Sequence, residues 1–500
     1  MQLQLVSTLS LGDLGVNAVS SGMALVLQGG VARLLYTPQD VNQALSLSLG
    51  SVSNPGSGYV LNQGIAPPVD WSSLQPNALM TFQDTGSGMR AFLYDSHSGT
   101  LTSTMLSSSG TPGSAHTVTT SIGSLSGVET FEIIGGPQGV CAAITKWNTA
   151  GVDLYHLASD GSMVFDSRIG DTAKSYVGNV SDTASVSIAG QDYLLTLSSL
   201  ENGLTSYAIA ADRSAAMIDT VGQHDGLYVS GPAALQVVNL AGLTYAIVAA
   251  TGSSSLSVVR VNPLGCLFVT DHVVDDLTTR FAHTQVLDSF TWNDRAFVVS
   301  AGSDAGITIM ELLPNGHLTP FHTVALETGA GLYGVTGLEV AVNGSTLQVF
   351  VVDAHADRVQ TFEMSLATIG GSITAGSGQT NGSALGDLIM GNAESQSFSG
   401  AGGDDWLVGG GGADAFSGGS GADTFVLDES LQTSTIVDYE KHLDRIDLSD
   451  WGYLYSVTAL TINATGTGAT LIYGDHQLRL ISADGHTLSA ADFTETDFLF

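Results

Sequence analysis

Basic residues are scarce in this 500-residue sequence. Lysine and arginine together number 13, aspartate and glutamate number 47, and the formal net charge is -34 at pH 7. A protein that binds nucleic acid presents a stripe of basic side chains, and the few cations here do not cluster along the chain. The composition therefore predicts no nucleic-acid partner, and it suits a protein that stays soluble in calcium-rich or saline surroundings.

Cysteines and long apolar runs are also few. The two cysteines, Cys141 and Cys266, are too few for a disulfide framework and fall in non-adjacent units of the repeat described below, so we expect free thiols. No stretch has the length of a membrane span, so none is predicted. The first residues, MQLQLVSTLSLGDLG, alternate in polarity and lack a cationic segment, so no secretory leader is expected there.

Helical periodicity is almost missing from residues 1–365. Apolar residues alternate there in short runs that Gly, Ser, Asn and Asp interrupt, which predicts strands. Five such runs recur at spacings of 52, 52, 51 and 52 residues: Val152–Tyr155, Leu204–Tyr207, Leu256–Val259, Ile307–Met310 and Val359–Phe362. Nine residues after the start of the first four comes a turn residue: Gly161, Arg213, Gly265 and Gly316.

The same pattern extends towards the N-terminus with longer loops. Arg90 followed by Gly99, and Val31 followed by Asp40, bring the number of units to seven. Four-stranded units of this length, repeated seven times, predict a seven-bladed β-propeller. The last unit is one strand short, and we expect Leu3–Leu9 to supply that strand and remove a free sheet edge.

Two segments of this region carry a family resemblance. AIVAATGSSSLSVVRVNPLGCL and AFVVSAGSDAGITIMELLPNGHL resemble blades of the YVTN or lactonase-like seven-bladed propellers. The resemblance implies the fold. It places no catalytic residue of that family on a position of this chain.

Glycine and aspartate recur with a period of nine from Gly382 to Val426. The five nonapeptides are GSALGDLIM, GNAESQSFS, GAGGDDWLV, GGGGADAFS and GGSGADTFV, close to GGxGxDxUx with U a large apolar residue. Glycines supply the turn, the aspartate offers a hard oxygen ligand, and the last three residues form a short strand whose apolar side chain faces inward.

Two nonapeptides are expected to make one turn of a parallel β-roll, so that residues 18 apart stack. Asp387 then lies beside Asp405, Asp405 beside Asp423, and Asp414 beside the uncharged Gln396 on the opposite side. We expect Ca²⁺ between the turns, and a roll that folds only with the metal. The predicted calcium-site residues are Asp387, Gly400, Gly402, Gly403, Asp405, Gly409, Gly411, Gly412, Asp414, Gly418, Gly421 and Asp423.

This run resembles the RTX (repeats-in-toxin) calcium-binding proteins, and the resemblance continues beyond it. ADTFVLDESLQTSTIVDYEKHLDRIDLSDW looks like the cap of the serralysin-type C-terminal domain, and the ending Asp497-Phe498-Leu499-Phe500 is similar to that of type I secretion substrates. The resemblance implies an extracellular protein exported by a type I secretion apparatus. Asp438 and Asp444 in the cap are candidates for a terminal calcium site, with solvated turn acids as the alternative.

The expected domains are a propeller at 1–365, a Gly/Ser/Thr-rich connector at 366–381, the roll at 382–427 and the cap with its export signal at 428–500. The composition of the connector suggests flexibility, with pairing of its first half to the roll as the alternative. An enzyme reading would need polar residues at the mouth of the propeller channel. The candidates are Glu129, Glu132, His224, Asp225, His283, Asp288 and Glu339, all of which are also ordinary surface or core residues in such a fold.

No G-x-S-x-G elbow, H-E-x-x-H helix or P-loop occurs in the sequence. The sequence therefore favours an extracellular binding, adhesion or scaffold protein whose partner is a carbohydrate or another protein. The alternatives are a secreted lactonase-like or other hydrolase that uses the channel, and a self-assembling surface-layer or filament subunit.

Overall fold

The computed structural model contains two compact units. It describes residues 2–10, 20–28, 31–38, 45–49, 80–84, 89–95, 99–106, 113–114, 116–118, 125–136, 139–158, 162–326, 332, 334–353, 355, 358–376 and 378–500. The first unit spans 1–290 and 296–365, and the second spans Thr291–Arg295 and 366–500. No described helix is long and apolar enough to cross a membrane.

Seven antiparallel sheets make up the described part of the first unit, six of four strands and one of three. The three-stranded sheet is β2 (Ser20–Gln28), β3 (Val31–Pro38) and β4 (Leu45–Leu49). The next three are β5 (Met80–Asp84), β6 (Met89–Asp95), β7 (Thr100–Met105) and β8 (His116–Thr117); β9 (Val128–Gly136), β10 (Gly139–Lys146), β11 (Val152–Leu157) and β12 (Met163–Ile169); and β13 (Val180–Ile188), β14 (Gln191–Ser198), β15 (Gly203–Ile209) and β16 (Ala215–Val221).

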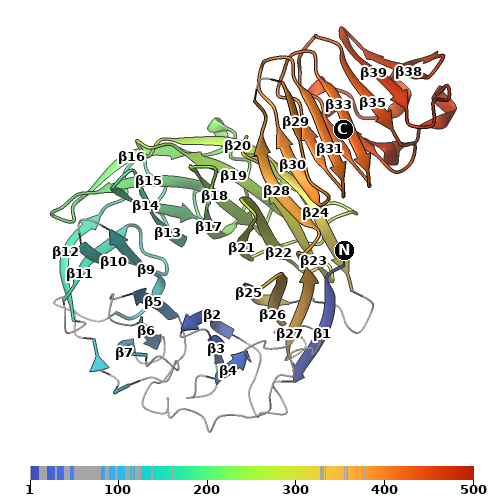
Figure 1. Cartoon of the computed structure of the whole chain (residues 1–500). Helices are drawn as coiled ribbons and strands as arrows, with labels where there is room; N and C mark the ends of the chain where they lie inside the picture. The colour runs from blue at the N-terminus through green and yellow to red at the C-terminus, as the bar shows by residue number, and fades with distance from the viewer. Residues whose placement is uncertain are drawn as a thin grey trace. The chain divides into compact units, whose positions relative to one another are not determined.

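The remaining sheets of this unit complete the series. They are β17 (Pro232–Leu240), β18 (Leu243–Ala250), β19 (Ser255–Val261) and β20 (Leu267–Val274); β21 (Val286–Trp292), β22 (Arg295–Ala301), β23 (Gly306–Leu312) and β24 (Leu318–Ala325); and β25 (Val335–Asn343), β26 (Thr346–Asp353), β27 (Arg358–Ser365) and β1 (Gln4–Ser10). In Figure 1 these sheets follow one another around a ring, with the first strand of each nearest its centre. The all-β fold and the blade-like sheets predicted from the sequence are confirmed.

The last sheet takes its outer strand from the other end of the chain. β1 pairs antiparallel with β27, from Gln4 opposite Glu363 to Ser10 opposite Arg358. This is the position that the sequence analysis assigns to the N-terminal strand. The pairing covers an edge that β27 would otherwise expose.

The middle strands explain the repeat seen in the sequence. β14, β18, β22 and β26 and the strands that follow them are buried along almost their whole length, because each sheet packs between two others. Strands covered on both faces carry continuous apolar runs such as AIVAA. The five runs at the 52-residue spacing are the third strands β11, β15, β19, β23 and β27, as the pattern predicts.

The extension of that pattern towards the N-terminus falls on strands, but on a different strand of each sheet. Arg90 lies in β6 and Val31 in β3, each the second strand of its sheet rather than the third. Gly99, with φ of 66°, turns the chain between β6 and β7. A glycine can occur in the turn of any hairpin. Once the loops change length, its position therefore no longer identifies which strand of the sheet precedes it. Gly161 and Asp40 lie outside the described residues.

Two parallel sheets form the roll of the second unit. One contains β28 (Ile369–Thr374), β30 (Gly386–Met390), β32 (Trp406–Val408), β34 (Thr424–Val426), β36 (Arg445–Asp447) and β40 (Phe498–Leu499). The other contains β29 (Gln379–Asn381), β31 (Ser397–Gly402), β33 (Ala415–Ser420), β35 (Ser434–Tyr439), β39 (His476–Ser482), β38 (Gly468–Tyr473) and β37 (Thr461–Thr465). Short 3-10 turns occur at Gln223–Asp225 (η2) in the first unit and, in the second, at Ser449–Trp451 (η3), Val457–Ala459 (η4), Ala490–Asp492 (η5) and Glu495–Asp497 (η6).

The register of the roll follows the nonapeptide. Leu388 pairs with Trp406 and Trp406 with Thr424, so one turn takes 18 residues. The apolar residue of each repeat faces inward and is almost fully buried: Ile389, Phe398, Leu407, Phe416 and Phe425. The rings of Phe398 and Phe416 stack at 5.1 Å. The roll is therefore a narrow apolar core between two rows of turns.

The stretch predicted as a flexible connector contributes two strands to the roll. β28 pairs with β30, and β29 pairs with β31, both in parallel. Its small residues allow close approach of neighbouring turns. At Gly370, for example, a Cβ would lie 2.0 Å from Asp387 Oδ1 of the next turn. Amino-acid composition alone does not distinguish glycines that allow close packing from glycines that make a linker flexible.

Candidate calcium centre

A ladder of aspartates runs along one side of the roll. Asp405 Oδ1 accepts a hydrogen bond of 2.7 Å from the backbone N–H of Asp387, and Asp423 Oδ1 accepts one of 2.9 Å from the N–H of Asp405. Asp444 Oδ1 continues the series by accepting from the N–H of Asp423 at 3.1 Å. The stacking that the 18-residue period predicts is present, and the cap adds one further step.

The second oxygen of each carboxylate points at the first glycine of its own repeat. A Cβ at Gly400 would lie 2.1 Å from Asp405 Oδ2 and 2.6 Å from the carbonyl oxygen of Gly418. A Cβ at Gly418 would lie 2.1 Å from Asp423 Oδ2. Any larger residue would therefore fill the space in which a carboxylate oxygen and a carbonyl oxygen of the next turn converge.

The central carboxylate of the ladder is incompletely bonded. Asp405 is 0% exposed, and its Oδ2 has no hydrogen-bond partner. Burial, together with the neighbouring charges of Asp423 and Asp387, raises the pKa of Asp405 to about 8. Burial likewise raises the pKa of Asp423 to about 6, with Asp438, Asp404 and Glu440 adding to the effect. A cation beside such groups favours their charged form.

The two ends of the ladder differ from its centre. Asp387 Oδ1 accepts from the N–H of Gly371 at 2.7 Å, and its Oδ2 accepts from the N–H of Ser383 at 2.5 Å. Asp444 Oδ2 accepts from the N–H of Glu440 at 2.7 Å. Both oxygens of each end member are thus bonded to backbone, so the demand for a metal is concentrated on Asp405 and Asp423.

The opposite side of the roll is poorer in charge. Asp414 Oδ1 accepts from the N–H of Gln396 at 2.8 Å, while the N–H of Asp414 donates to Ser434 Oγ at 3.0 Å. Gln396 replaces an aspartate here and uses its own Oε1 to accept from the N–H of Asn392. Burial and the nearby Asp428 raise the pKa of Asp414 to about 6. One incompletely bonded aspartate therefore stands where the other side has two.

The glycines at the fourth position of the repeat form the turns themselves. Gly403 and Gly421 have φ of 95° and 135°, a region that side chains disfavour. Ala401 adopts φ of 75° at the second position, where the following two repeats have glycine. Gly412, with φ of 85°, is the fourth-position glycine of the turn between β32 and β33, which also contains Gly409 and Gly411. Gly402 is the last residue of β31.

The two cap candidates take different places. Asp444 lies in the ladder, whereas Asp438 accepts from the N–H groups of Gly418 and Gly419 and from Ser417 Oγ. Asp438 therefore fixes the last glycine turn and adds negative charge near Asp423. Neither behaves as a purely solvated turn acid.

Two acidic residues near the ladder were missed by the sequence analysis. Asp404 accepts from the N–H of Ala422, 18 residues later, at 2.9 Å. Asp428 Oδ2 lies 3.2 Å from the position of a Cβ on Gly411. The 18-residue period could have identified Asp404, while Asp428 lies beyond the last nonapeptide and has no such signal.

The donor set fits calcium. The turns offer carboxylate and carbonyl oxygens without nitrogen or sulfur, which is the chemistry that Ca²⁺ selects. Asp405, Asp423 and Asp414, with the carbonyl groups of the glycine turns, are the residues that would hold it. When bound, the cation neutralises buried carboxylates and joins successive turns. Among the described residues, no group of three or more His, Cys, Asp and Glu side chains forms a metal cluster.

The channel candidates of the first unit have a different environment. Glu132 Oε1 accepts from the N–H and Oγ of Ser185 on the next sheet, at 2.9 and 2.6 Å. Asp288 Oδ2 accepts from the N–H of Val340 on the next sheet at 2.8 Å. Asp182, which the sequence analysis missed, does the same with the N–H of Leu235 at 2.7 Å. These carboxylates join neighbouring blades.

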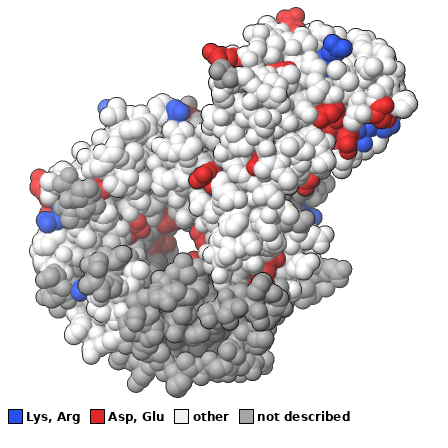
Figure 2. Space-filling view, in the orientation of Figure 1, with Lys and Arg blue, Asp and Glu red and all other residues white. Residues whose placement is uncertain are grey.

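The spacing of acidic residues along the sequence could have identified Asp182. Glu129 and Asp182 are 53 residues apart, and Asp182 and Asp288 are separated by two such intervals. Burial raises the pKa of Asp182 to about 7 and that of Asp288 to about 6, and it also raises the pKa of Glu129 and Glu132. Figure 2 shows acidic side chains around the hollow at the centre of this unit.

The other candidates lie apart from this row. Asp225 caps its own short turn by accepting from the N–H of Gly222, and the adjacent His224 is exposed. His283 Nδ1 lies 3.1 Å from Ser303 Oγ on an exposed turn. Glu339 lies on the innermost strand β25. The described contacts do not bring these residues together as an acid and base pair.

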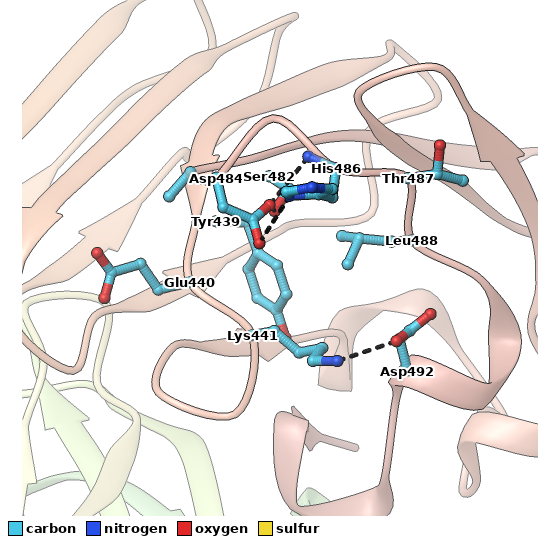
Figure 3. A pocket seen from close by; sticks show the side chains of 10 residues that line it. Tyr439, Glu440, Lys441, Ser482, Asp484, His486, Thr487, Leu488 and Asp492 are labelled. Carbon is cyan, nitrogen blue, oxygen red and sulfur yellow. Dashed lines mark hydrogen bonds and ion pairs between the residues drawn. The ribbon is translucent and has the colours of Figure 1, made fainter.

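A cavity of about 550 Å³ opens in the cap (Figure 3). Lys441 Nζ and Asp492 Oδ1 form an ion pair of 2.9 Å on one wall. On another wall, Asp484 Oδ1 accepts from Ser482 Oγ and from the N–H of His486. Figure 3 shows that Lys441 pairs with Asp492 and that Asp484 bonds to Ser482 and His486.

The family model of the RTX calcium-binding nonapeptide repeat matches residues 387–425 in four copies. This region coincides with the ladder, so the repeats are calcium-binding repeats. A search of curated protein sequences finds no significant relative.

Solved structures similar to this chain include a protein from Lactobacillus plantarum, at 12% identity and a TM-score of 0.46, covering 65% of this chain and 94% of the other. Another, from Bacteroides fragilis and provisionally assigned as a 6-phosphogluconolactonase, has 12% identity, a TM-score of 0.42 and coverage of 69% and 94%. A functionally unknown protein from Desulfotomaculum acetoxidans has 12% identity, a TM-score of 0.38 and coverage of 66% and 93%. The assignment of the first unit rests on its sheets rather than on these scores.

Proposed function

We propose that this chain is an exported calcium-binding protein whose first unit binds a partner outside the cell, as an adhesin or scaffold. Its roll folds when it meets calcium after passage through a type I secretion apparatus. RTX repeats are typical of secreted proteins, which supports this location.

The observation that carries the proposal is the unpaired Oδ2 of Asp405 in a buried ladder. A buried carboxylate without a partner destabilises a fold, so the roll is expected to be unstable until a cation joins its turns. Calcium is scarce inside cells and abundant outside, and a ligand that binds only the folded state stabilises it in proportion to its concentration. The roll would therefore stay open during export and close afterwards.

A binding role for the first unit is supported by the use of its acidic residues. Glu132, Asp182 and Asp288 accept hydrogen bonds from the backbone of the next blade, which holds the sheets together. A rigid ring of this kind presents loops in fixed positions, as binding scaffolds do.

Two measurements on the full chain test the proposal. Purified protein is incubated with intact bacterial cells in millimolar calcium or in EGTA, and the fraction that sediments with the cells is measured. We expect retention in calcium, and we expect it to persist when Asp405 and Asp423 are both changed to Asn, because the first unit binds the partner. Absence of retention in calcium would contradict a surface-binding role.

The second measurement addresses export and catalysis. Cells that carry a type I exporter should release the full chain into the medium, while a chain truncated after residue 427 should stay inside. Turnover of a lactone that Asp288→Asn abolishes would replace the binding proposal with the hydrolase reading.

A further inference from the structure

A polar groove opens at one end of the β13–β16 sheet. Its volume is about 430 Å³, and its walls include Thr172, Lys174, Tyr176, Glu201 and Thr220. The first three lie on the link 170–179 between β12 and β13, Glu201 lies on the turn between β14 and β15, and Thr220 lies near the end of β16. Pockets of this size accommodate small ligands or single units of a polymer.

Tyr176 is held in the groove by two glycines. A Cβ at Gly203 would lie 2.3 Å from Cδ2 of the tyrosine ring, and a Cβ at Gly222 would lie 2.4 Å from its Oη. The N–H of Tyr176 donates to Thr205 Oγ1 at 2.9 Å. The ring therefore occupies a fixed place and stays partly exposed, so it offers a preformed flat surface.

The carboxylates of the groove are already in use. Glu201 Oε2 accepts from the N–H of Gly178 at 2.8 Å. Asp219 Oδ1 accepts from the N–H of Thr220, and Asp219 Oδ2 accepts from the N–H of Leu267, both at 2.9 Å. What the groove presents to a ligand is thus an aromatic ring, the apolar side chains of Met217 and Ile218, hydroxyl groups and one ammonium group.

Two exposed apolar side chains stand beside the groove. Trp147 and Leu200 are 63% and 71% exposed and lie on equivalent turns of neighbouring sheets. Asn179 joins these turns, because its Oδ1 accepts from the N–H of Asn148 and its Nδ2 donates to Ser199 Oγ. The link that carries Tyr176 therefore also fixes the positions of Trp147 and Leu200.

We propose that this groove, the Tyr176 groove, binds a neutral oligosaccharide or one segment of a neutral polysaccharide. Sugar rings present C–H faces that pack on aromatic rings and hydroxyl groups that pair with Thr, Glu and Lys side chains. A net charge of -34 disfavours polyanionic glycans. The apolar side chains at the groove, Met217 and Ile218, are only partly exposed and are flanked by Thr172, Lys174 and Thr220, which suits a sugar chain better than the continuous apolar centre of a protein interface. The inference rests on the proposed binding function and specifies its partner.

The test is isothermal titration of the calcium-loaded full chain with cellohexaose, maltohexaose, mannohexaose and chitohexaose, with oligogalacturonate as the charged comparison. We expect at least one neutral oligosaccharide to bind. Tyr176→Ala should weaken that binding by about tenfold or more, and Tyr176→Phe should stay within about threefold of the unaltered chain. Leu264→Ala is the matched control, because Leu264 is 72% exposed on a turn at the opposite end of the strands.

A second variant separates loss of the ring from loss of folding. Gly222→Ala keeps Tyr176 but displaces the end of its ring, because the added Cβ would lie 2.8 Å from Cζ, so it should weaken binding while the thermal midpoint stays close to that of the unaltered chain. Binding of none of the four neutral sugars, binding of oligogalacturonate alone, or unchanged binding in Tyr176→Ala would each overturn the inference. If cell retention persists in Tyr176→Ala, the proposed function stands and the partner is a different molecule.

Discussion

Buried carboxylates hold both units together, but they are completed in different ways. In the first unit, Asp182 Oδ1 accepts from the N–H of Thr183 and its Oδ2 accepts from the N–H of Leu235, so both oxygens are bonded. In the roll, Asp405 Oδ1 accepts from the N–H of Asp387 while its Oδ2 has no partner. In the first arrangement, the polypeptide itself supplies the hydrogen-bond donors to both carboxylate oxygens. The second is left for a cation.

This difference suggests how one chain combines a stable part with a conditional part. In the first unit, backbone N–H donors of a neighbouring blade reach the carboxylates as soon as the sheets pack. In the roll, carboxylate and carbonyl oxygens outnumber the N–H donors that could bond them. The roll is thus expected to depend on calcium and the first unit to be independent of it.

The largest expected effect comes from Asp405→Asn. Loss of the central charge should weaken calcium binding by about tenfold or more and raise the calcium concentration at which the roll folds. Calcium titration followed by far-ultraviolet circular dichroism measures both. Asp387→Asn is the control, because both oxygens of Asp387 are bonded to backbone, and it should shift the titration less. Equal shifts of the calcium titration in the two variants would contradict the difference between the central and the end aspartates of the ladder.

Gln396→Asp should act in the opposite direction. It adds a carboxylate beside Asp414 on the poorer side of the roll, and calcium affinity rises with the number of charged ligands. We expect one additional tightly bound ion per chain or an affinity about threefold higher. Equilibrium dialysis with calcium-45 gives the stoichiometry, and an unchanged count and affinity would show that this side holds no ion.

The first unit should respond to pH rather than to calcium. Burial raises the pKa of Asp182 to about 7, so between about pH 4 and pH 7 the folded state binds more protons than the unfolded chain. The free energy of unfolding should therefore decrease as the pH rises through that range. Asp182→Asn, which does not titrate, should flatten the dependence of the thermal midpoint on pH. If the pH dependence of the thermal midpoint were unchanged in Asp182→Asn, that dependence would arise from other groups.

The smallest effect is expected at Ala401. A φ of 75° is costly for alanine and free for glycine, while glycine also loses more entropy on folding. Ala401→Gly should therefore stabilise the calcium-loaded roll by about 0.5 kcal/mol, measured by denaturant titration. Destabilisation would indicate that the alanine methyl group makes a packing contact that outweighs its backbone strain.

The sequence predicts best where one short period controls both fold and site. The 18-residue spacing of Asp387, Asp405 and Asp423 sets their stacking, so their neighbours follow from counting. Asp444 joins the same ladder 21 residues after Asp423, because the cap breaks the period and only the folded chain brings it into line. Likewise, β28 and β29 come from a stretch whose small residues look like a linker.

The longer period of the first unit is a weaker guide. It identified the third strands, but Arg90 falls in a second strand, because loops of different length shift the register of a turn glycine. It also left the roles of Glu132 and Asp288 open, since their hydrogen-bond donors lie on the next blade. Pairing between repeats, rather than within one, determines what those carboxylates do.

Hydrogen exchange of the full chain, read by mass spectrometry with and without calcium, tests the central difference most directly. Amides of β30, β32 and β34 should exchange fast in EGTA and become protected in millimolar calcium, while those of β14 and β18 should be protected in both. Protection of the roll strands that is the same with and without calcium would contradict the account.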